Sequence, residues 1–170
     1  HNYADFQSAL QRELVQQVQS PLLRSSIQNE TVSKNGMSPF VQTIVDNIEE
    51  TFSHLSAPDM QRLAKVLCDP KRRLHLLGGR FTDAIAQYMA AHLRIISADV
   101  FHIIGQEGNW RDQLVDMGKR DVVIVFDIRR YQESLLNFSQ RATARGVSVI
   151  LFTDQWLSPI ARFAKQVITC

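Results

Sequence analysis

The sequence has few of the residues that mark specialised classes of protein. Its 170 residues include two cysteines, Cys68 and Cys170, which lie far apart and fit no metal-binding or redox spacing. We interpret them as reduced structural thiols and expect a cytoplasmic protein with no metal and no cofactor. No apolar run approaches the roughly 20 residues that a membrane helix needs, so we expect no membrane partner.

The chain also lacks a strong charge of one sign. Its formal net charge is +2, which is too small to indicate a nucleic-acid-binding face by itself. A hydrophobic content of 45% with 21% charged residues is typical of a globular protein, and 170 residues suffice for one α/β core with an appended segment. The chain begins at His1, and Val167–Cys170 reads as the start of a strand. We therefore expect a piece of a longer protein.

What the chain does contain is an alternation of strand and helix patterns over its last hundred residues. Helical patterns follow the strand-like runs, two of them ending at Gly118 and Gly146, and a short helix is expected from Ser158-Pro159. The β-branched run at Asp121–Phe126 indicates a strand that is covered on both faces. This alternation predicts an α/β fold with a doubly wound parallel sheet of about five strands, flanked by helices. The expected strands are Leu74–Leu77, Val100–Ile104, Asp121–Phe126, Val147–Phe152 and a segment beginning at Val167.

The first seventy residues predict a helical extension instead. An apolar stripe at helical spacing runs from Tyr3 to Leu14, and Ser20-Pro21 interrupts it. Residues 21–37 are predicted to be a linker. Ser38-Pro39 is typical of a helix start, so Phe40–Phe52 is expected to be a long amphipathic helix. A second helix is expected to begin at Ala57-Pro58-Asp59.

Doubly wound sheets bind ligands beyond the carboxyl ends of their strands, where the strand order reverses. The first such turn, Gly78-Gly79-Arg80-Phe81-Thr82, ends in residues that can cap a helix, and anions bind at such turns because the first N–H groups of a helix lack backbone partners. The later turns Asp127–Gln132 and Thr153–Trp156 are expected around the same crevice. The candidate ligand-binding residues are Gly78, Gly79, Arg80, Thr82, Asp127, Arg129, Arg130, Tyr131, Thr153, Asp154 and Trp156.

From about Phe40 to Cys170 these residues resemble the sugar isomerase (SIS) domain, and in particular the effector domain of the RpiR/MurR transcriptional regulators of bacteria. The family pattern Gly-x-Gly-x-Ser corresponds to Gly78–Thr82, with Arg80 in place of the second glycine and Thr82 in place of the serine. The family pattern Ser-x-Ser-Gly-x-Thr corresponds to Asp127–Gln132, where none of its residues is kept. The third region, Thr153-Asp154 with Ser158-Pro159, matches well.

Two interpretations of the altered loops stay open. On the first, Arg80, Arg129 and Arg130 hold a phosphosugar or a sugar acid, because guanidinium groups bind phosphate and carboxylate in pairs of hydrogen bonds. On the second, Arg80 pairs with Asp127 and fills the crevice, which leaves a domain that only dimerises. Trp156 and Tyr131 have two open interpretations of their own: each would either stack on a sugar ring or cover a neighbouring subunit.

A phosphosugar isomerase on the same fold is the other alternative, because isomerisation needs a carboxylate or a histidine beside the substrate carbonyl. Glu107, Glu133, His75 and His102 are the candidates. Both histidines lie within expected strands and are interpreted as packing residues, and Glu133 lies in a first helical turn, where a carboxylate is favoured without any catalytic role. Glu107 is interpreted as a solvated loop residue. We therefore expect no catalysis.

The resemblance implies the ligand-sensing domain of a transcriptional regulator. Residues 1–20 would be the closing helix of a helix-turn-helix DNA-binding domain, residues 21–37 a linker, and residues 38–170 the SIS-type domain. The implied partners are an anionic sugar-derived effector, operator DNA through the missing part of the N-terminal domain, and a second copy of the chain in a homodimer or a higher homo-oligomer. The basic run Lys71–Arg73 is interpreted as a solvated turn.

Overall fold

The computed structural model describes residues 39–105 and 107–170. The chain divides into two compact units, residues 1–49 and residues 50–170. The helix expected at Phe40–Phe52 is present as α3 (Pro39–His54). The predicted closing helix at 1–20 and the linker at 21–37 lie outside the described residues. Within the described ranges, no helix combines the length and the apolar character that crossing a bilayer requires.

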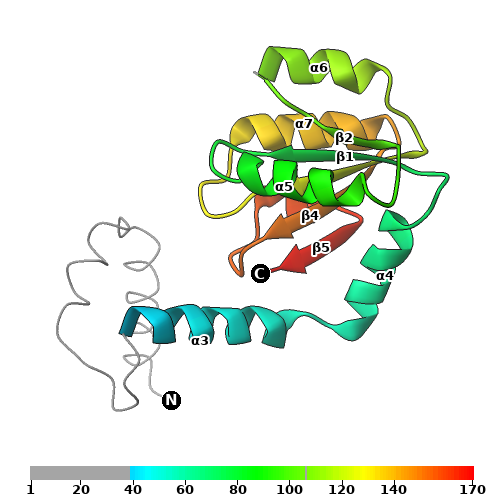
Figure 1. The fold of residues 1–170 in the computed structure, drawn as a ribbon. Helices are drawn as coiled ribbons and strands as arrows, with labels where there is room; N and C mark the ends of the chain where they lie inside the picture. Colours follow the sequence, from blue (N-terminus) through cyan, green and yellow to red (C-terminus); the bar gives the residue numbers. More distant parts are fainter. Residues whose placement is uncertain (1–38, 106) are drawn as a thin grey trace. The chain divides into compact units, whose positions relative to one another are not determined.

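Five parallel strands form one sheet in the second unit (Figure 1). The order β2-β1-β3-β4-β5 places β1 between its two neighbours, so the chain winds outward from β1 in both directions. This topology confirms the expected doubly wound sheet. The edge strand β2 is shorter than predicted, since Ile104 lies beyond its end and is 62% exposed. The strands are β1 (Arg73–Gly78), β2 (Val100–His102), β3 (Asp121–Phe126), β4 (Ser148–Thr153) and β5 (Gln166–Thr169).

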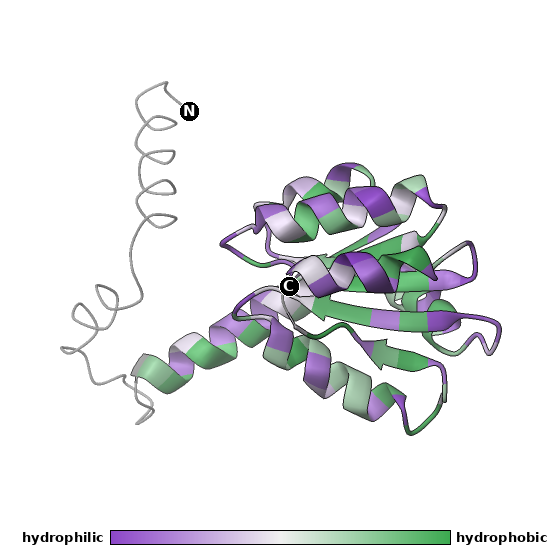
Figure 2. Ribbon diagram, turned by 90° about the horizontal axis from the view of Figure 1, so that it is seen from above, coloured by the Kyte–Doolittle hydropathy of each residue, from purple (hydrophilic) through white to green (hydrophobic). Residues whose placement is uncertain are grey.

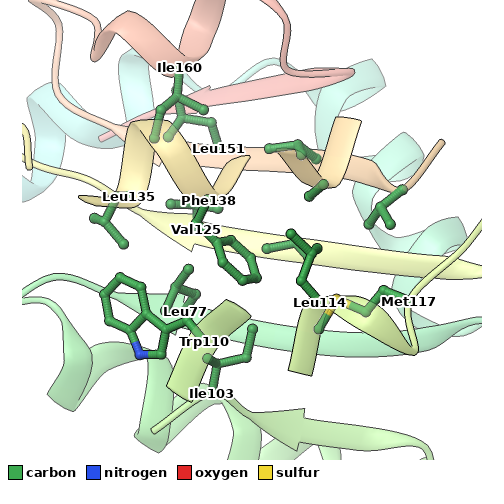
Figure 3. Packing of buried hydrophobic residues seen from close by; sticks show 14 residues of the cluster. Leu77, Ile103, Trp110, Leu114, Met117, Val125, Leu135, Phe138, Leu151 and Ile160 are labelled. Carbon is green, nitrogen blue, oxygen red and sulfur yellow. The ribbon is translucent and has the colours of Figure 1, made fainter. Parts of the chain in front are cut away.

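Helices cover both faces of this sheet, and the side chains of successive strand residues point to opposite faces. On one face, Val122, Ile124 and Ile150 pack with residues of α4 and α5. On the other, Val123 and Val125 pack with residues of α6, α7 and η1. Figure 3 shows Val125 among these residues. The central residues of β3 and β4 are therefore apolar and polar residues stand mainly at the strand ends, whereas the helices mix polar and apolar residues (Figure 2). The helices are α4 (Ala57–Leu67), α5 (Asp83–Leu93), α6 (Glu107–Val115), α7 (Glu133–Ala144) and the 3₁₀ helix η1 (Pro159–Arg162).

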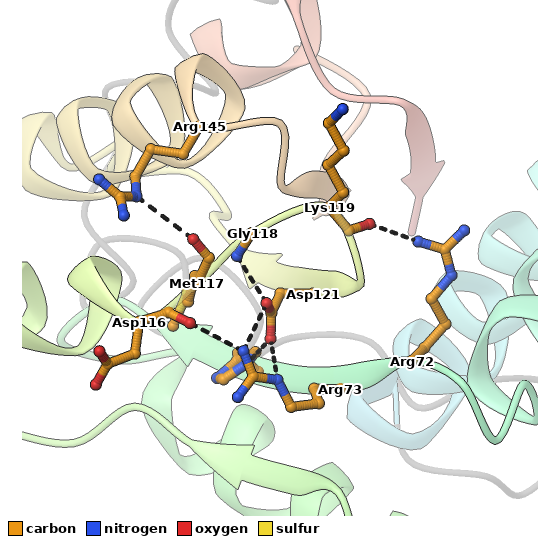
Figure 4. A network of polar contacts seen from close by, with 9 residues as sticks. Arg72, Arg73, Asp116, Met117, Gly118, Lys119, Asp121 and Arg145 are labelled. Atoms are coloured by element: carbon orange, nitrogen blue, oxygen red, sulfur yellow. Dashed lines mark hydrogen bonds and ion pairs between the residues drawn. The ribbon is translucent and has the colours of Figure 1, made fainter.

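A buried carboxylate at the start of β3 organises the amino-terminal edge of the sheet (Figure 4). Asp121 has no exposed surface, and its oxygens accept hydrogen bonds from Arg73 Nη2 at 2.8 Å and from the Gly118 N–H at 2.7 Å. Arg73 Nε lies 2.7 Å from Asp121 Oδ1, and His75 Nε2 lies 2.9 Å from the same oxygen. Arg73 also donates to the Asp116 carbonyl at 2.9 Å. Every part of the Asp121 carboxylate is thus engaged within the protein.

This network corrects one expectation and confirms another. The run Lys71–Arg73 is not simply a solvated turn, because Arg73 opens β1 and pairs with Asp121, while Arg72 donates to the Lys119 carbonyl at 2.9 Å. The partner of Arg73 lies 48 positions away in the sequence, so no local pattern announces it. His75 is a packing residue as predicted: its side chain is buried, and its ring stacks on Phe101 with 5.1 Å between centroids.

Candidate functional site

The carboxyl ends of β1 and β3 lie side by side, and a cavity of about 200 Å³ opens between the loops that follow them. Gly78 of β1 pairs in register with Phe126 of β3, so both loops begin at the same level of the sheet. This is the switch point of the sheet, where ligands of such folds bind. The residues that line the cavity are Gly79, Arg80, Phe81, Thr82, Asp127, Ile128, Arg130 and Gln132.

The first loop is held tightly against the sheet. A Cβ built on Gly78 would overlap the backbone of Thr82 and Asp83, so α5 begins as close to β1 as a glycine allows. The Thr82 hydroxyl accepts a hydrogen bond from the Gly79 N–H at 2.8 Å and donates one to the Phe126 carbonyl at 2.6 Å. Thr82 occupies the N-cap position of α5, but its side chain makes no capping hydrogen bond, contrary to the expected cap. Its role is to tie the loop to β3.

Asp127, at the start of the second loop, is bound within the protein rather than paired with Arg80. Its carboxylate accepts hydrogen bonds from Ser158 Oγ at 2.5 Å and from the Gln132 N–H at 3.3 Å, and the side chain is buried. Burial raises the pKa of Asp127, although both hydrogen bonds act in the opposite direction. Among the described residues no ion pair joins Arg80 to Asp127. The crevice is therefore not filled in the way that the dimerisation-only interpretation requires.

Asp154 shapes the middle of the second loop. Its buried carboxylate accepts hydrogen bonds from the Arg129 N–H at 2.7 Å and from the Tyr131 hydroxyl at 2.5 Å. Arg129 has a φ of 63°, a left-handed conformation that costs energy for a residue with a side chain. Burial and the neighbouring Asp154 carboxylate together raise the pKa of Tyr131. Asp154 therefore serves to hold the strained loop in its conformation.

Two guanidinium groups lie at the mouth of the cavity on a single aromatic ring. Arg80 and Arg130 stand over the Phe81 ring, with 5.4 and 5.8 Å from the guanidinium carbon to the ring centroid. Neither arginine belongs to any of the ion pairs formed by residues 39–105 and 107–170. Cation–π contacts at exposed positions contribute only about 0.5–1 kcal/mol, so an anion competes easily for these groups. The cavity therefore presents two guanidinium groups without a carboxylate partner among the described residues.

A second cavity, of about 370 Å³, lies on the other side of the first loop. It is lined by Glu107, one of the four residues considered for catalysis, and by Asp83, whose Oδ1 is hydrogen-bonded to His102 Nε2 at 2.8 Å. Glu133 is exposed on α7 and His75 belongs to the Asp121 network, so neither lines this cavity. Its lining residues are Gly78, Gly79, Arg80, Asp83, Ile103, Gly105, Glu107, Trp110, Gln132 and Ser134.

The structure brings six of the eleven candidate residues to these two cavities: Gly78, Gly79, Arg80, Thr82, Asp127 and Arg130. The other five support or flank the second loop. Thr153 is buried and accepts a hydrogen bond from the Ser158 N–H, and the Arg129 guanidinium stands over the Trp156 ring at 5.6 Å. Asp154 and Tyr131 bond to each other, as described above.

Sequence reasoning missed three lining residues of the first cavity, Phe81, Ile128 and Gln132. Gln132 could have been predicted as a site residue, because it stands at the threonine position of the family's second loop pattern. No three His, Cys, Asp or Glu side chains of the described ranges lie close enough together to hold a metal ion.

The SIS domain family model matches residues 67–170, and the chain belongs to that family. Among solved structures, the sugar isomerase domain of an RpiR transcription factor from Sphaerobacter thermophilus has 21% sequence identity and a TM-score of 0.68, covering 78% of this chain and 75% of that chain. The c3406 protein of E. coli CFT073 has 20% identity and a TM-score of 0.60, covering 81% and 74%.

The NanR protein of Vibrio vulnificus, complexed with ManNAc-6P, has 15% identity and a TM-score of 0.64. That match covers 99% of this chain and 57% of NanR, so this chain spans little more than half of it. At such identities the likeness shows the fold, and it confirms the SIS-type sheet that the sequence predicts. No curated protein sequence matches the chain.

Proposed function

We propose that this chain is the effector-sensing part of a bacterial transcriptional regulator of the RpiR type, and that it binds a phosphosugar or another anionic sugar derivative between β1 and β3. The observation that carries this proposal is the pair Arg80 and Arg130 at the mouth of the switch-point cavity, with no carboxylate partner among the described residues. Guanidinium groups in this setting favour phosphate or carboxylate. The phosphosugar complex of NanR, which shares the fold, supports the same ligand class.

Effector binding is tested by calorimetry and thermal shift with phosphosugars, sugar acids and inorganic phosphate. Arg80→Ala and Arg130→Ala should each weaken binding at least tenfold, because a hydrogen bond to a charged group contributes about 1.5–3 kcal/mol. Arg120→Ala is the matched control, since Arg120 is exposed and directly precedes β3 at the opposite edge of the sheet. If a ligand bound the wild type and all three variants with equal affinity, its binding site would not include Arg80 or Arg130.

We further propose that the chain pairs with a second copy through α5, so that two DNA-binding domains read paired half-sites of an operator. Large apolar side chains on this helix and just before it are exposed: Ile85 is 46% and Tyr88 68% exposed on α5, and Phe81, which precedes the helix, is 66% exposed. The stripe of exposed apolar residues consists of Ile85 and Tyr88, which are three residues apart and share one side of α5, and Phe81, which precedes the N-cap residue Thr82. Because Phe81 also lines the first cavity, a partner seated on this stripe would contact the effector site.

The double variant Ile85→Glu/Tyr88→Glu should shift a dimer to monomer in analytical ultracentrifugation, because two buried carboxylates have no partner in an apolar interface. Gln87→Glu adds a charge to the same helix outside the stripe and should leave the sedimentation unchanged. If the double variant sediments like the wild type, the chain associates through another surface.

Phosphosugar isomerisation is the second candidate function, and the position of Glu107 in the second cavity favours it. A carboxylate there could carry a proton between the two carbons that exchange the carbonyl group. The discriminating measurement is turnover of ketose and aldose phosphates by the wild type and by Glu107→Gln. Turnover that the substitution abolishes would favour the enzyme, whereas binding without turnover favours the regulator.

A further inference from the structure

The side chain of Gln132 stands between the two cavities of the site. Both cavities are lined by Gly79, Arg80 and Gln132. Gln132 Oε1 accepts a hydrogen bond from the Arg80 N–H at 2.7 Å. The carboxamide of one loop thus closes on the backbone of the other, and it separates a space of about 200 Å³ from one of about 370 Å³.

The Arg80 N–H is the kind of donor that an anion takes at such a turn, since it lies three residues before the first residue of α5 and is bound to no backbone carbonyl. An amide oxygen is a neutral acceptor, and an anionic oxygen forms roughly twice as strong a bond with the same donor. The bond from Gln132 therefore satisfies the donor in the absence of a ligand without competing strongly against one.

Gly79 makes room for this arrangement. A Cβ at Gly79 would overlap Gln132 Oε1, so any other residue there would push the carboxamide away. The backbone of Gln132 is held independently of its side chain, because its N–H donates to Asp127 Oδ1 and its carbonyl accepts from the Leu136 N–H at 3.1 Å. The side chain can rotate while the loop and the start of α7 stay in place.

We propose that Gln132 holds the place of an anionic effector oxygen and is displaced when the effector binds. This inference rests on the proposed function, and it adds a statement about the ligand. Once the carboxamide rotates away, the two cavities join, so the effector is a phosphorylated or carboxylated sugar with its anionic group at the Arg80 N–H, beside Arg80 and Arg130. Its hydroxyl-bearing body extends into the second cavity, toward Glu107 and Trp110.

The test is calorimetric titration of the wild type, Gln132→Ala and Gln132→Glu with inorganic phosphate, with hexose 6-phosphates and other phosphosugars, and with sugar acids. Gln132→Ala should bind about fivefold more tightly, since the ligand no longer competes with one neutral hydrogen bond. Gln132→Glu should bind more weakly, because a carboxylate holds the donor more strongly and repels the ligand. Gln140→Ala removes the same group from an exposed position of α7 and should match the wild type.

Each outcome decides a different point. If the wild type binds and Gln132→Ala binds equally or more weakly, the displacement is refuted while the proposed function stands, since the carboxamide would then be neutral or a ligand contact. If no protein of the set binds any of these anions, the proposed function fails and this inference fails with it. A direct readout is the ¹⁵N resonance of Arg80: addition of phosphate to the wild type should shift it, and an unmoved resonance in a protein that binds phosphate overturns the proposal.

Discussion

Replacing Asp121 with alanine is expected to lower the free energy of unfolding by about 3–5 kcal/mol, because breaking a buried ion pair leaves its partner without compensation. Arg73 and His75 would then have lost their shared acceptor, and the Gly118 N–H would have no acceptor from this side chain. The carboxylate has no exposed surface, so water cannot replace it without rearrangement. Urea denaturation followed by circular dichroism measures the loss.

Asp116→Asn is the matched control for this prediction. Asp116 is exposed and takes part in the network through its backbone carbonyl, which the substitution keeps. The free energy of unfolding of the Asp116→Asn variant should stay within about 0.5 kcal/mol of the wild-type value, as is usual for surface substitutions. A loss below 1 kcal/mol for Asp121→Ala would mean that the network is not a major source of stability.

Acid should weaken the same network. Burial by itself raises the pKa of Asp121, but the hydrogen bonds from Arg73, the Gly118 N–H and His75 outweigh it, so the pKa is lowered overall. The stabilisation is therefore complete above the unfolded-state pKa of about 3.9 and is lost as the pH falls through the folded value. Burial lowers the pKa of His75, so the folded state resists its protonation and stability also falls as the pH drops below about 6.5.

Gly78→Ala is expected to destabilise the domain by about 3 kcal/mol, at the upper end of the usual cost of overpacking. The added methyl group would overlap the backbone of Thr82 and Asp83, and a backbone segment cannot move aside as the end of a flexible side chain can. Because α5 would have to retreat from β1, the loop at Arg80 should also lose its position and effector affinity should fall. Denaturant unfolding and ligand titration of the same variant measure both effects.

Gly108→Ala provides the contrast. Gly108 lies within α6, and a Cβ there would meet no atom within 4 Å. This substitution should stabilise the domain by about 0.5–1 kcal/mol through helix propensity, and it should leave effector affinity unchanged. If Gly78→Ala and Gly108→Ala changed the free energy of unfolding alike, the close approach of α5 to β1 would not be the reason that residue 78 must be a glycine.

The strands were predictable because their signal is local. All six residues of β3 are buried, and an uninterrupted apolar run with β-branched residues is what a strand covered on both faces requires. β2 shows the limit of that signal, since the apolar run continues to Ile104 while the pairing with β1 stops at His102. A run of apolar residues does not show at which residue an edge strand stops pairing with the next strand.

The site was predictable only in its position. The alternation of strands and helices predicts a parallel sheet with all strand-end turns at one edge, and the observed strand order brings the turns after β1 and β3 together. Side-chain partners were not predictable: Asp127 bonds to Ser158, 31 positions away, rather than to Arg80. Gln132 reaches the Arg80 N–H across 52 positions. Contacts of this kind depend on the finished packing and leave no periodic pattern in the sequence.

The two ends of β3 lie in different parts of the structure. Asp121 opens the strand inside the stabilising network, and Asp127 follows its last residue, in a loop that lines the first cavity. Six residues of extended chain separate these ends by roughly 20 Å, beyond the range over which substitutions usually interact. Substitutions in the loops that line the cavities should therefore leave the Asp121 network intact. A protein built on this strand can therefore change the residues around its cavity without losing the interactions that stabilise the sheet.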